Sequence, residues 1–138
     1  MSDRSIFLVE DSDDFAFAIR RVWSKVSPDI ELVHFSDTVS AMAELLERAK
    51  TDRLPMLVLL DLNMPGRDGR DLLADLRDEN RLHHLPVVVL TTSRREEDVR
   101  YAYRHGARAF HVKPDCVDLL RETMELIRRY WLETAELP

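Results

Sequence analysis

The chain has 138 residues, of which 20 are basic and 26 acidic, and the net charge of −6 argues against nucleic-acid binding as its main function. This length predicts a single domain, 1–138, and the lone cysteine, Cys116, excludes an internal disulfide. No apolar run approaches the roughly 20 residues that span a membrane and no signal peptide is recognisable, so we expect a cytoplasmic protein without a membrane partner.

Five short apolar runs, each bounded by turn residues, have the pattern of strands that are buried on both faces. A stretch with helical periodicity follows each run, so the chain reads as five strand–helix units. The predicted strands cover residues 5–9, 30–35, 56–61, 87–91 and 107–112. Strict alternation predicts an α/β fold with three αβα layers around a doubly wound, five-stranded parallel sheet. We expect the flavodoxin-like strand order 2-1-3-4-5.

The five predicted helices begin at polar capping residues or directly after turn residues. Their expected starting positions are Ser12 or Asp13, Ser36, Gly69, Ser93 and Asp115. The loop before the third helix is marked by Pro65 and Gly66. The last helix is expected to continue to about residue 133, with the part beyond about 128 forming an extension.

Chemically reactive side chains lie at the carboxyl ends of four of the predicted strands. If the first and third strands are neighbours, Glu10, Asp11 and Asp61 meet at the carboxyl edge of the sheet. Three carboxylates repel one another unless a cation lies among them, and Mg²⁺ suits such a site. The fourth and fifth strands bring the hydroxyl of Thr91 and the ammonium of Lys113 to the same edge. This combination predicts a phosphoryl-transfer site in which Asp61 is the nucleophile.

These residues resemble the motifs of CheY-like receiver domains, the response regulators of two-component signalling. The resemblance covers residues 6–127 and rests on Glu10-Asp11, on the D-L-N-M-P-G-x-D-G motif of 61–69, on Thr91 and on the G-A-x-x-F-x-x-K-P motif of 106–114. It implies a stand-alone regulator that accepts a phosphoryl group on Asp61 from a sensor histidine kinase or a phosphotransfer protein. It also implies that the protein is not an enzyme, apart from its own phosphorylation and dephosphorylation.

The resemblance further assigns a role to each residue of the site. The ligands of Mg²⁺ would be Glu10 through water, Asp11, Asp61 and the backbone carbonyl of Asn63. The groups that contact the phosphoryl oxygens would be Thr91, Lys113 and backbone N–H groups near Asn63 and Thr92.

The resemblance also implies a conformational switch. Thr91 would move toward the phosphoryl group while Phe110 turns inward, although Phe110 lacks the hydroxyl of the Tyr that many family members carry. Asn63 and Ser93 flank the path of the attacking water and are expected to tune the lifetime of the phosphoryl group. The peptide bond at 113–114 precedes a proline and is expected to be cis, as it is in the family.

The last predicted helix carries more apolar residues than one buried stripe requires. Its residues beyond 128 resemble, together with the stretch 91–98, small stand-alone regulators that are paired with phytochrome kinases. We therefore expect a homodimer built on the fourth and fifth helices, with cross-pairs between charged residues of the two copies. The charged residues expected to supply them are Glu96, Glu97, Asp98, Arg100, Arg104, Arg121, Glu122 and Glu125. The expected interface residues are Arg100, Arg104, Leu119, Leu126, Tyr130 and Trp131. The alternative, in which Trp131 only folds back over the core, remains open.

Three other functions share this architecture. An FMN-binding flavodoxin needs a phosphate-binding loop after the first strand, where this chain has the acidic stretch 10–14. A phosphatase of the haloacid-dehalogenase type needs a second Asp two residues after the nucleophile, where this chain has Asn63. A phosphorylation-independent interaction module of receiver fold stays open as the alternative function.

Overall fold

The structure, a computed structural model that describes residues 4–64 and 68–137, is built around a five-stranded parallel sheet. The predicted strand order is confirmed, because the strands lie in the order β2-β1-β3-β4-β5. Their bounds are β1 Ser5–Val9, β2 Glu31–Phe35, β3 Val58–Leu60, β4 Val87–Thr91 and β5 Ala109–Val112. The three central strands are buried along their whole length, whereas the edge strands β2 and β5 are largely half-buried.

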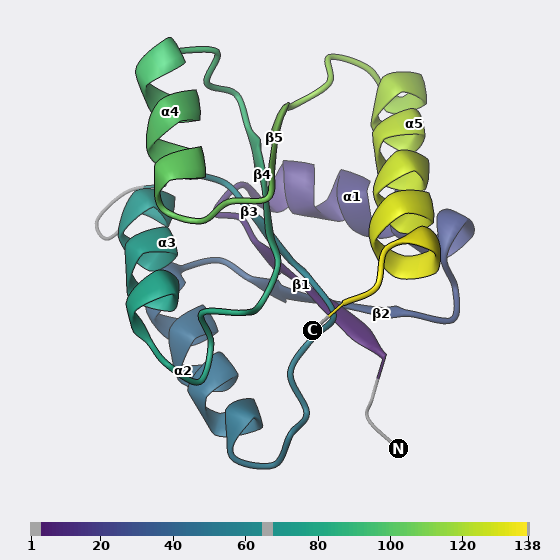
Figure 1. Ribbon diagram of the computed structural model, residues 1–138. Helices are drawn as coiled ribbons and strands as arrows, with labels where there is room; N and C mark the ends of the chain where they lie inside the picture. The colour runs from purple at the N-terminus through teal and green to yellow at the C-terminus, as the bar shows by residue number, and fades with distance from the viewer. Residues whose placement is uncertain (1–3, 65–67, 138) are drawn as a thin grey trace.

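Helices cover both faces of the sheet, so the predicted three layers are also confirmed (Figure 1). The helices are α1 Asp13–Val26, α2 Thr38–Ala49, α3 Gly69–Asp78, α4 Glu96–Arg104 and α5 Val117–Ile127. The last helix continues as a π-helical segment, η1 Arg128–Thr134. One face of the sheet packs against α1 and α5, and the other packs against α2, α3 and α4 (Figure 1). None of the helices in the described ranges has the length and apolar content needed to cross a membrane.

Alternation along each strand divides the core into two apolar clusters. In β1, Ile6 and Leu8 face α1 and α5, while Phe7 and Val9 face the three helices on the opposite side. The largest fully buried side chain is Trp23 of α1, whose indole N–H donates a hydrogen bond of 2.8 Å to the carbonyl of Ile30. This bond satisfies the polar atom of an otherwise apolar core residue.

The register of the sheet decides which residues meet at its carboxyl edge. Val9 of β1 pairs with Leu60 of β3, and the N–H of Asp61 donates to the carbonyl of Val9 at 3.0 Å. Between the neighbouring strands β4 and β5, the N–H of Lys113 donates to the carbonyl of Thr91 at 2.7 Å. Main-chain hydrogen bonds therefore hold Asp61 and Lys113 at the carboxyl ends of the strands.

Several element boundaries differ from the sequence prediction. The second helix is capped by Asp37 rather than Ser36, because the Asp37 carboxylate accepts the N–H of Ser40 at 2.7 Å. The fourth helix begins at Glu96, since the hydroxyl of Ser93 donates to Asp98 and so does not cap its first turn. The last helix begins at Val117, after Cys116, rather than at Asp115.

Two further expectations concern peptide geometry and the loop before α3. The structure contains no cis peptide bond in its described residues, so the expectation of a cis bond at Lys113–Pro114 was wrong. Proline reduces the preference for trans only to about 0.5–1 kcal/mol, so the dipeptide alone does not fix the isomer. The predicted turn at Pro65 and Gly66 lies outside the described residues.

Candidate functional site

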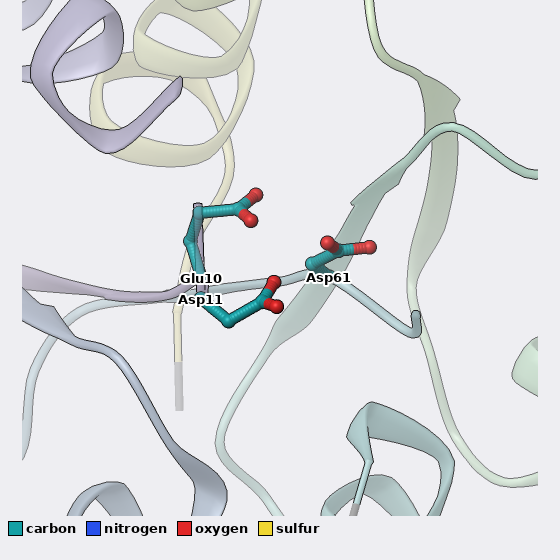
Figure 2. A group of neighbouring side chains, drawn as sticks. All are labelled: Glu10, Asp11 and Asp61. Carbon is teal, nitrogen blue, oxygen red and sulfur yellow. The ribbon is translucent and has the colours of Figure 1, made fainter. Parts of the chain in front are cut away.

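Three carboxylates converge at the carboxyl ends of β1 and β3 (Figure 2). Glu10, Asp11 and Asp61 each offer one oxygen, and these oxygens all lie within 4.8 Å of one another. Glu10 and Asp61 are buried, whereas Asp11 is exposed. The predicted acidic cluster is thus assembled, with an open side through which a ligand can enter. Carboxylate oxygens at this spacing fit a hard divalent cation.

Lys113 reaches the same point from the end of β5. Its ammonium nitrogen lies 2.7 Å from Glu10 Oε1 and 3.2 Å from Asp61 Oδ2, so it pairs with both buried carboxylates. The ammonium also lies 4.3 Å from the centre of the Phe15 ring, which restricts it from the side of α1. A fixed positive charge therefore stands next to the predicted nucleophile.

Glu10 has an unusual proton affinity because of where it lies. Burial raises the pKa of its carboxyl to about 7, and the hydrogen bond from Lys113 only partly opposes this effect. The N–H of Ser12 donates to its other oxygen at 3.0 Å, and its backbone carbonyl lies 2.7 Å from His34 Nε2. Glu10 consequently takes up a proton near neutral pH unless additional positive charge stabilises the carboxylate.

The carboxylate of Asp61 is held from both sides. Its Oδ1 accepts the backbone N–H of Asn63 at 3.1 Å, and its Oδ2 accepts from Lys113. The N–H of Gly69, the first residue of α3, donates to the carbonyl of Leu62 at 3.1 Å and brings α3 against the end of β3. Asp61 is therefore oriented by the fold and needs no ligand to fix it.

The predicted hydroxyl groups lie on the same edge, at the end of β4. The side-chain amide of Asn63 donates to the hydroxyl of buried Thr91 at 3.3 Å and to that of exposed Thr92 at 3.5 Å. Phe110 lies on β5, half-buried, and packs against the cluster under α2, α3 and α4. The structure thus brings together all seven residues predicted to bind the metal or the phosphoryl group.

Sequence reasoning missed two residues beside this site, Arg70 and Asp98. The guanidinium of Arg70 lies 2.8 Å from Asp98 Oδ1 and contacts Asn63 Oδ1 at 3.2 Å. The expectation that the charges at 96–98 all supply cross-pairs was wrong for Asp98, because this carboxylate is buried inside the molecule. No local signal in the sequence marks Asp98 as buried, because it is the third of three acidic residues in the first turn of α4.

The predicted interface residues do not all face outward. Leu119, Leu126 and Tyr130 are 49%, 57% and 54% exposed and lie along one side of α5 and η1. Trp131 is half-buried and packs against the core beneath α1 and α5, as the alternative interpretation held. Arg100 is exposed and pairs with Glu96 at 3.5 Å, and Arg104 is exposed on the same helix. Whether they form an interface stays a prediction.

Comparison with known proteins agrees with this geometry. The chain is 37% identical over 145 residues to the response regulator Rcp1 of Synechocystis sp., covering all of this chain and 99% of that protein. It is 33% identical over 122 residues to the chemotaxis protein CheY of Pseudomonas aeruginosa, covering 83% of this chain and 90% of CheY.

Solved structures extend the similarity to three dimensions. The crystal structure of the phosphorylated cyanobacterial phytochrome response regulator RcpA superposes with a TM-score of 0.90 at 34% identity, covering 99% of each chain. The Mn²⁺-bound form of Rcp1 superposes with a TM-score of 0.85 at 36% identity, covering 98% of this chain and 99% of Rcp1. The profile of the response regulator receiver domain matches residues 6–125. The chain therefore belongs to the response regulator receiver domain family.

Proposed function

We propose that this protein is a stand-alone response regulator that accepts a phosphoryl group on Asp61. The observation that carries the proposal is the position of the Asp61 carboxylate, whose Oδ2 lies 3.2 Å from the ammonium of Lys113 and whose neighbours Glu10 and Asp11 complete an acidic cluster. A carboxylate that attacks phosphorus needs positive charge close to the oxygens of the transferred group. Lys113 supplies part of that charge from the residue that follows β5.

The donor set at this edge fits Mg²⁺. Asp11 and Asp61 would bind the ion together with the backbone carbonyl of Asn63, and Glu10 would act through water. The bound ion would supply positive charge that offsets the repulsion between the carboxylates and an incoming phosphoryl group. The Mn²⁺-bound form of the relative Rcp1 supports a divalent ion in this family. The raised pKa of Glu10 supports it too, because a cation would relieve the cost of its buried charge.

The phosphoryl group would come from a sensor histidine kinase, and the relatives RcpA and Rcp1 favour a kinase of the phytochrome type. The hydroxyl of Thr91 and the ammonium of Lys113 would hold the phosphoryl oxygens after transfer. We further propose that residues 1–138 act as one receiver domain in the cytoplasm and turn over no external substrate. Asn63 occupies the place where a phosphatase of this chemistry would need an acid, which supports that part of the proposal.

The output would leave through the side of the molecule formed by α5 and η1. Leu119, Leu126 and Tyr130 present apolar surface there, and Leu126 and Tyr130 also border a groove of about 300 Å³ between β5 and α5. We propose that a second copy of the chain covers this surface and that phosphorylation changes the strength of that contact.

The central claim is tested with acetyl phosphate and Mg²⁺, followed by intact-mass measurement. We expect wild type to gain one phosphoryl group, Asp61→Asn to gain none, and the exposed surface variant Asp78→Asn to behave like wild type. Absence of any gain in wild type would reject the phosphoacceptor function and favour a phosphorylation-independent interaction module.

The partner is tested by transfer from phosphorylated histidine kinases. We expect faster transfer from the kinase of a phytochrome photoreceptor than from a chemotaxis kinase at equal concentration. Equal rates, or faster transfer from the chemotaxis kinase, would reject the phytochrome assignment without affecting the role of Asp61.

A further inference from the structure

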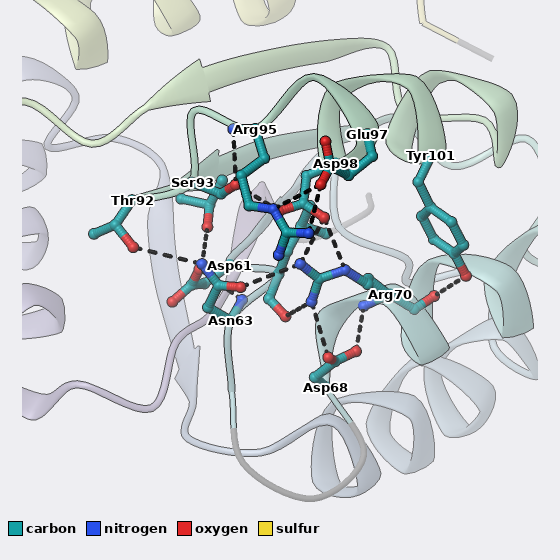
Figure 3. A network of polar contacts seen from close by, with 12 residues as sticks. Asp61, Asn63, Asp68, Arg70, Thr92, Ser93, Arg95, Glu97, Asp98 and Tyr101 are labelled. Carbon is teal, nitrogen blue, oxygen red and sulfur yellow. Dashed lines mark hydrogen bonds and ion pairs between the residues drawn. The ribbon is translucent and has the colours of Figure 1, made fainter.

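The side chain of Asn63 lies next to Asp61, and both ends of its carboxamide are occupied (Figure 3). Its nitrogen donates to the hydroxyls of Thr91 and Thr92, and its oxygen accepts from Arg70 Nη2 at 3.2 Å. The acceptor atom of Asn63 is therefore turned toward α3 instead of toward the open side of the site.

Arg70 is fixed firmly enough to hold Asn63 in this orientation. Its Nη2 and Nε lie 2.8 and 3.2 Å from Asp98 Oδ1, and its Nη1 lies 2.9 Å from Asp68 Oδ2 and 3.3 Å from the carbonyl of Leu62. Multiple charge-assisted bonds restrict a guanidinium far more than one surface ion pair does. The Arg70–Asp98 pair thus links the start of α3 to α4 across the rim of the site (Figure 3).

The same ion pair also fixes Ser93, the other side chain on the predicted path of an attacking water. The hydroxyl of Ser93 donates to Asp98 Oδ2 at 2.5 Å and accepts the N–H of Arg95 at 3.2 Å. Burial would raise the pKa of Asp98, but the bonds from Ser93 and Arg70 lower it, so the carboxylate is ionised at neutral pH. Ser93 and Asn63 are thus each hydrogen-bonded to one member of the Arg70–Asp98 ion pair.

We propose that Arg70 is a positioning residue that prolongs the life of the acyl phosphate on Asp61 by occupying the carboxamide oxygen of Asn63. This inference rests on the proposed function. In hydrolysis, a water oxygen forms a bond to phosphorus and the bond between phosphorus and the Asp61 oxygen breaks. The electron pair of that bond returns to the carboxylate, and one proton of the water passes to an oxygen of the departing phosphate.

A free acceptor beside Asp61 would align that water and so accelerate the reaction. Asn63 lies beside Asp61, and its Oδ1 already accepts one hydrogen bond from Arg70, which turns this oxygen toward α3. Removal of Arg70 therefore frees a water-binding atom beside Asp61, and none of the described contacts of Arg70 is with Asp61, Lys113 or the other two carboxylates.

The test is the half-life of the phosphorylated protein, measured by intact mass after acetyl phosphate is removed. We expect Arg70→Ala to shorten the half-life roughly three- to tenfold, the effect on a rate of one hydrogen bond of ordinary strength. Arg81→Ala serves as the control, because Arg81 is an exposed arginine that pairs only with nearby Glu79 in the described contacts.

A second measurement separates positioning from a general loosening of the fold. In an Asn63→Ala background, Arg70→Ala should have no further effect on the half-life, because the atom it releases is gone. Should Arg70→Ala prove poorly folded, Asp98→Asn replaces it: the amide still accepts from Ser93 but no longer holds the guanidinium, and we expect the same shortening.

The outcomes distinguish the two proposals. An unchanged or longer half-life in Arg70→Ala, or equal shortening in both backgrounds, overturns the role of Arg70 and leaves Asp61 as the acceptor. A wild-type protein that takes up no phosphoryl group overturns the proposed function, and the role of Arg70 falls with it.

Discussion

Gly69 lies directly against the main chain of Asp61. A Cβ atom on Gly69 would stand 2.1 Å from the carbonyl oxygen of Asp61 and 2.7 Å from the Cα of Leu62. Both contacts are with backbone atoms, so no rotation of a side chain can relieve them. The first turn of α3 and the end of β3 can approach as they do only because this residue has no side chain.

Gly69→Ala should therefore lower the free energy of unfolding by about 2 kcal/mol or more and slow phosphoryl acceptance, because the chain at Asp61 must move. Urea denaturation and intact mass after acetyl phosphate treatment measure the two effects. Gly106→Ala is the matched control: φ at Gly106 is +93°, so the alanine is strained, yet the nearest atom to its Cβ is Arg77 Cδ at 3.9 Å. We expect that variant to lose stability but to retain normal acceptance, and a fully stable Gly69→Ala would contradict the argument.

Lys113 pairs with two of the carboxylates that a divalent cation would bind, so the lysine and the cation compete for them. Its ammonium lies 2.7 Å from Glu10 and 3.2 Å from Asp61, so Lys113→Gln should make Mg²⁺ bind several-fold more tightly while phosphoryl acceptance falls. Isothermal titration with Mg²⁺ measures the affinity. Lys50→Gln, which removes an exposed lysine directly after α2, should leave both quantities unchanged. Weaker Mg²⁺ binding in Lys113→Gln would show that the lysine does not oppose the cation.

The pH dependence of Mg²⁺ binding should report the titration of Glu10. Because burial raises the pKa of Glu10 to about 7, the folded protein holds a proton there below that pH, and the cation must displace it. Affinity should thus fall as the pH drops from about 8 to about 6, by up to roughly tenfold per unit below the pKa. In Glu10→Gln the affinity should be nearly constant over the same window. A wild-type affinity that does not vary there would mean that Glu10 is ionised throughout.

The exposed apolar stripe on α5 and η1 predicts self-association. At tens of micromolar, wild type should sediment as a dimer, and Leu126→Glu should be monomeric because it places a charge in the stripe. Val39→Glu is the control, since Val39 is a similarly exposed apolar residue on α2. Trp131→Ala is a poor test, because Trp131 packs against the core. A monomeric wild type would reject the dimer.

Most of the fold and of the site could be predicted from the sequence, because both depend on local patterns of apolar and polar residues. The apolar runs placed β1, β3 and β4, and the strand order then forced Glu10, Asp61 and Lys113 together. Helix starts were harder to predict, since neighbouring polar residues compete for the capping position. Asp37 caps α2 in place of Ser36 because its carboxylate accepts the N–H of Ser40.

The Arg70–Asp98 pair could not be predicted from the sequence by the same reasoning. The two residues are far apart in the chain, and neither follows a strand. An arginine after a glycine and an aspartate among other acids both look like ordinary surface residues. Only the close approach of α3 and α4 buries the aspartate and makes the pair part of the site.

A main-chain hydrogen bond joins Lys113 to Thr91, the two residues predicted to contact a phosphoryl group on Asp61. Because the amide of one is joined to the carbonyl of the other at 2.7 Å, a backbone displacement of either is passed to its partner. A displacement of Thr91 on phosphorylation would then move the edge strand β5 as well. The groove between β5 and α5 would change shape with that strand. The state of Asp61 would thus be felt at the groove between β5 and α5, where Leu126 and Tyr130 lie.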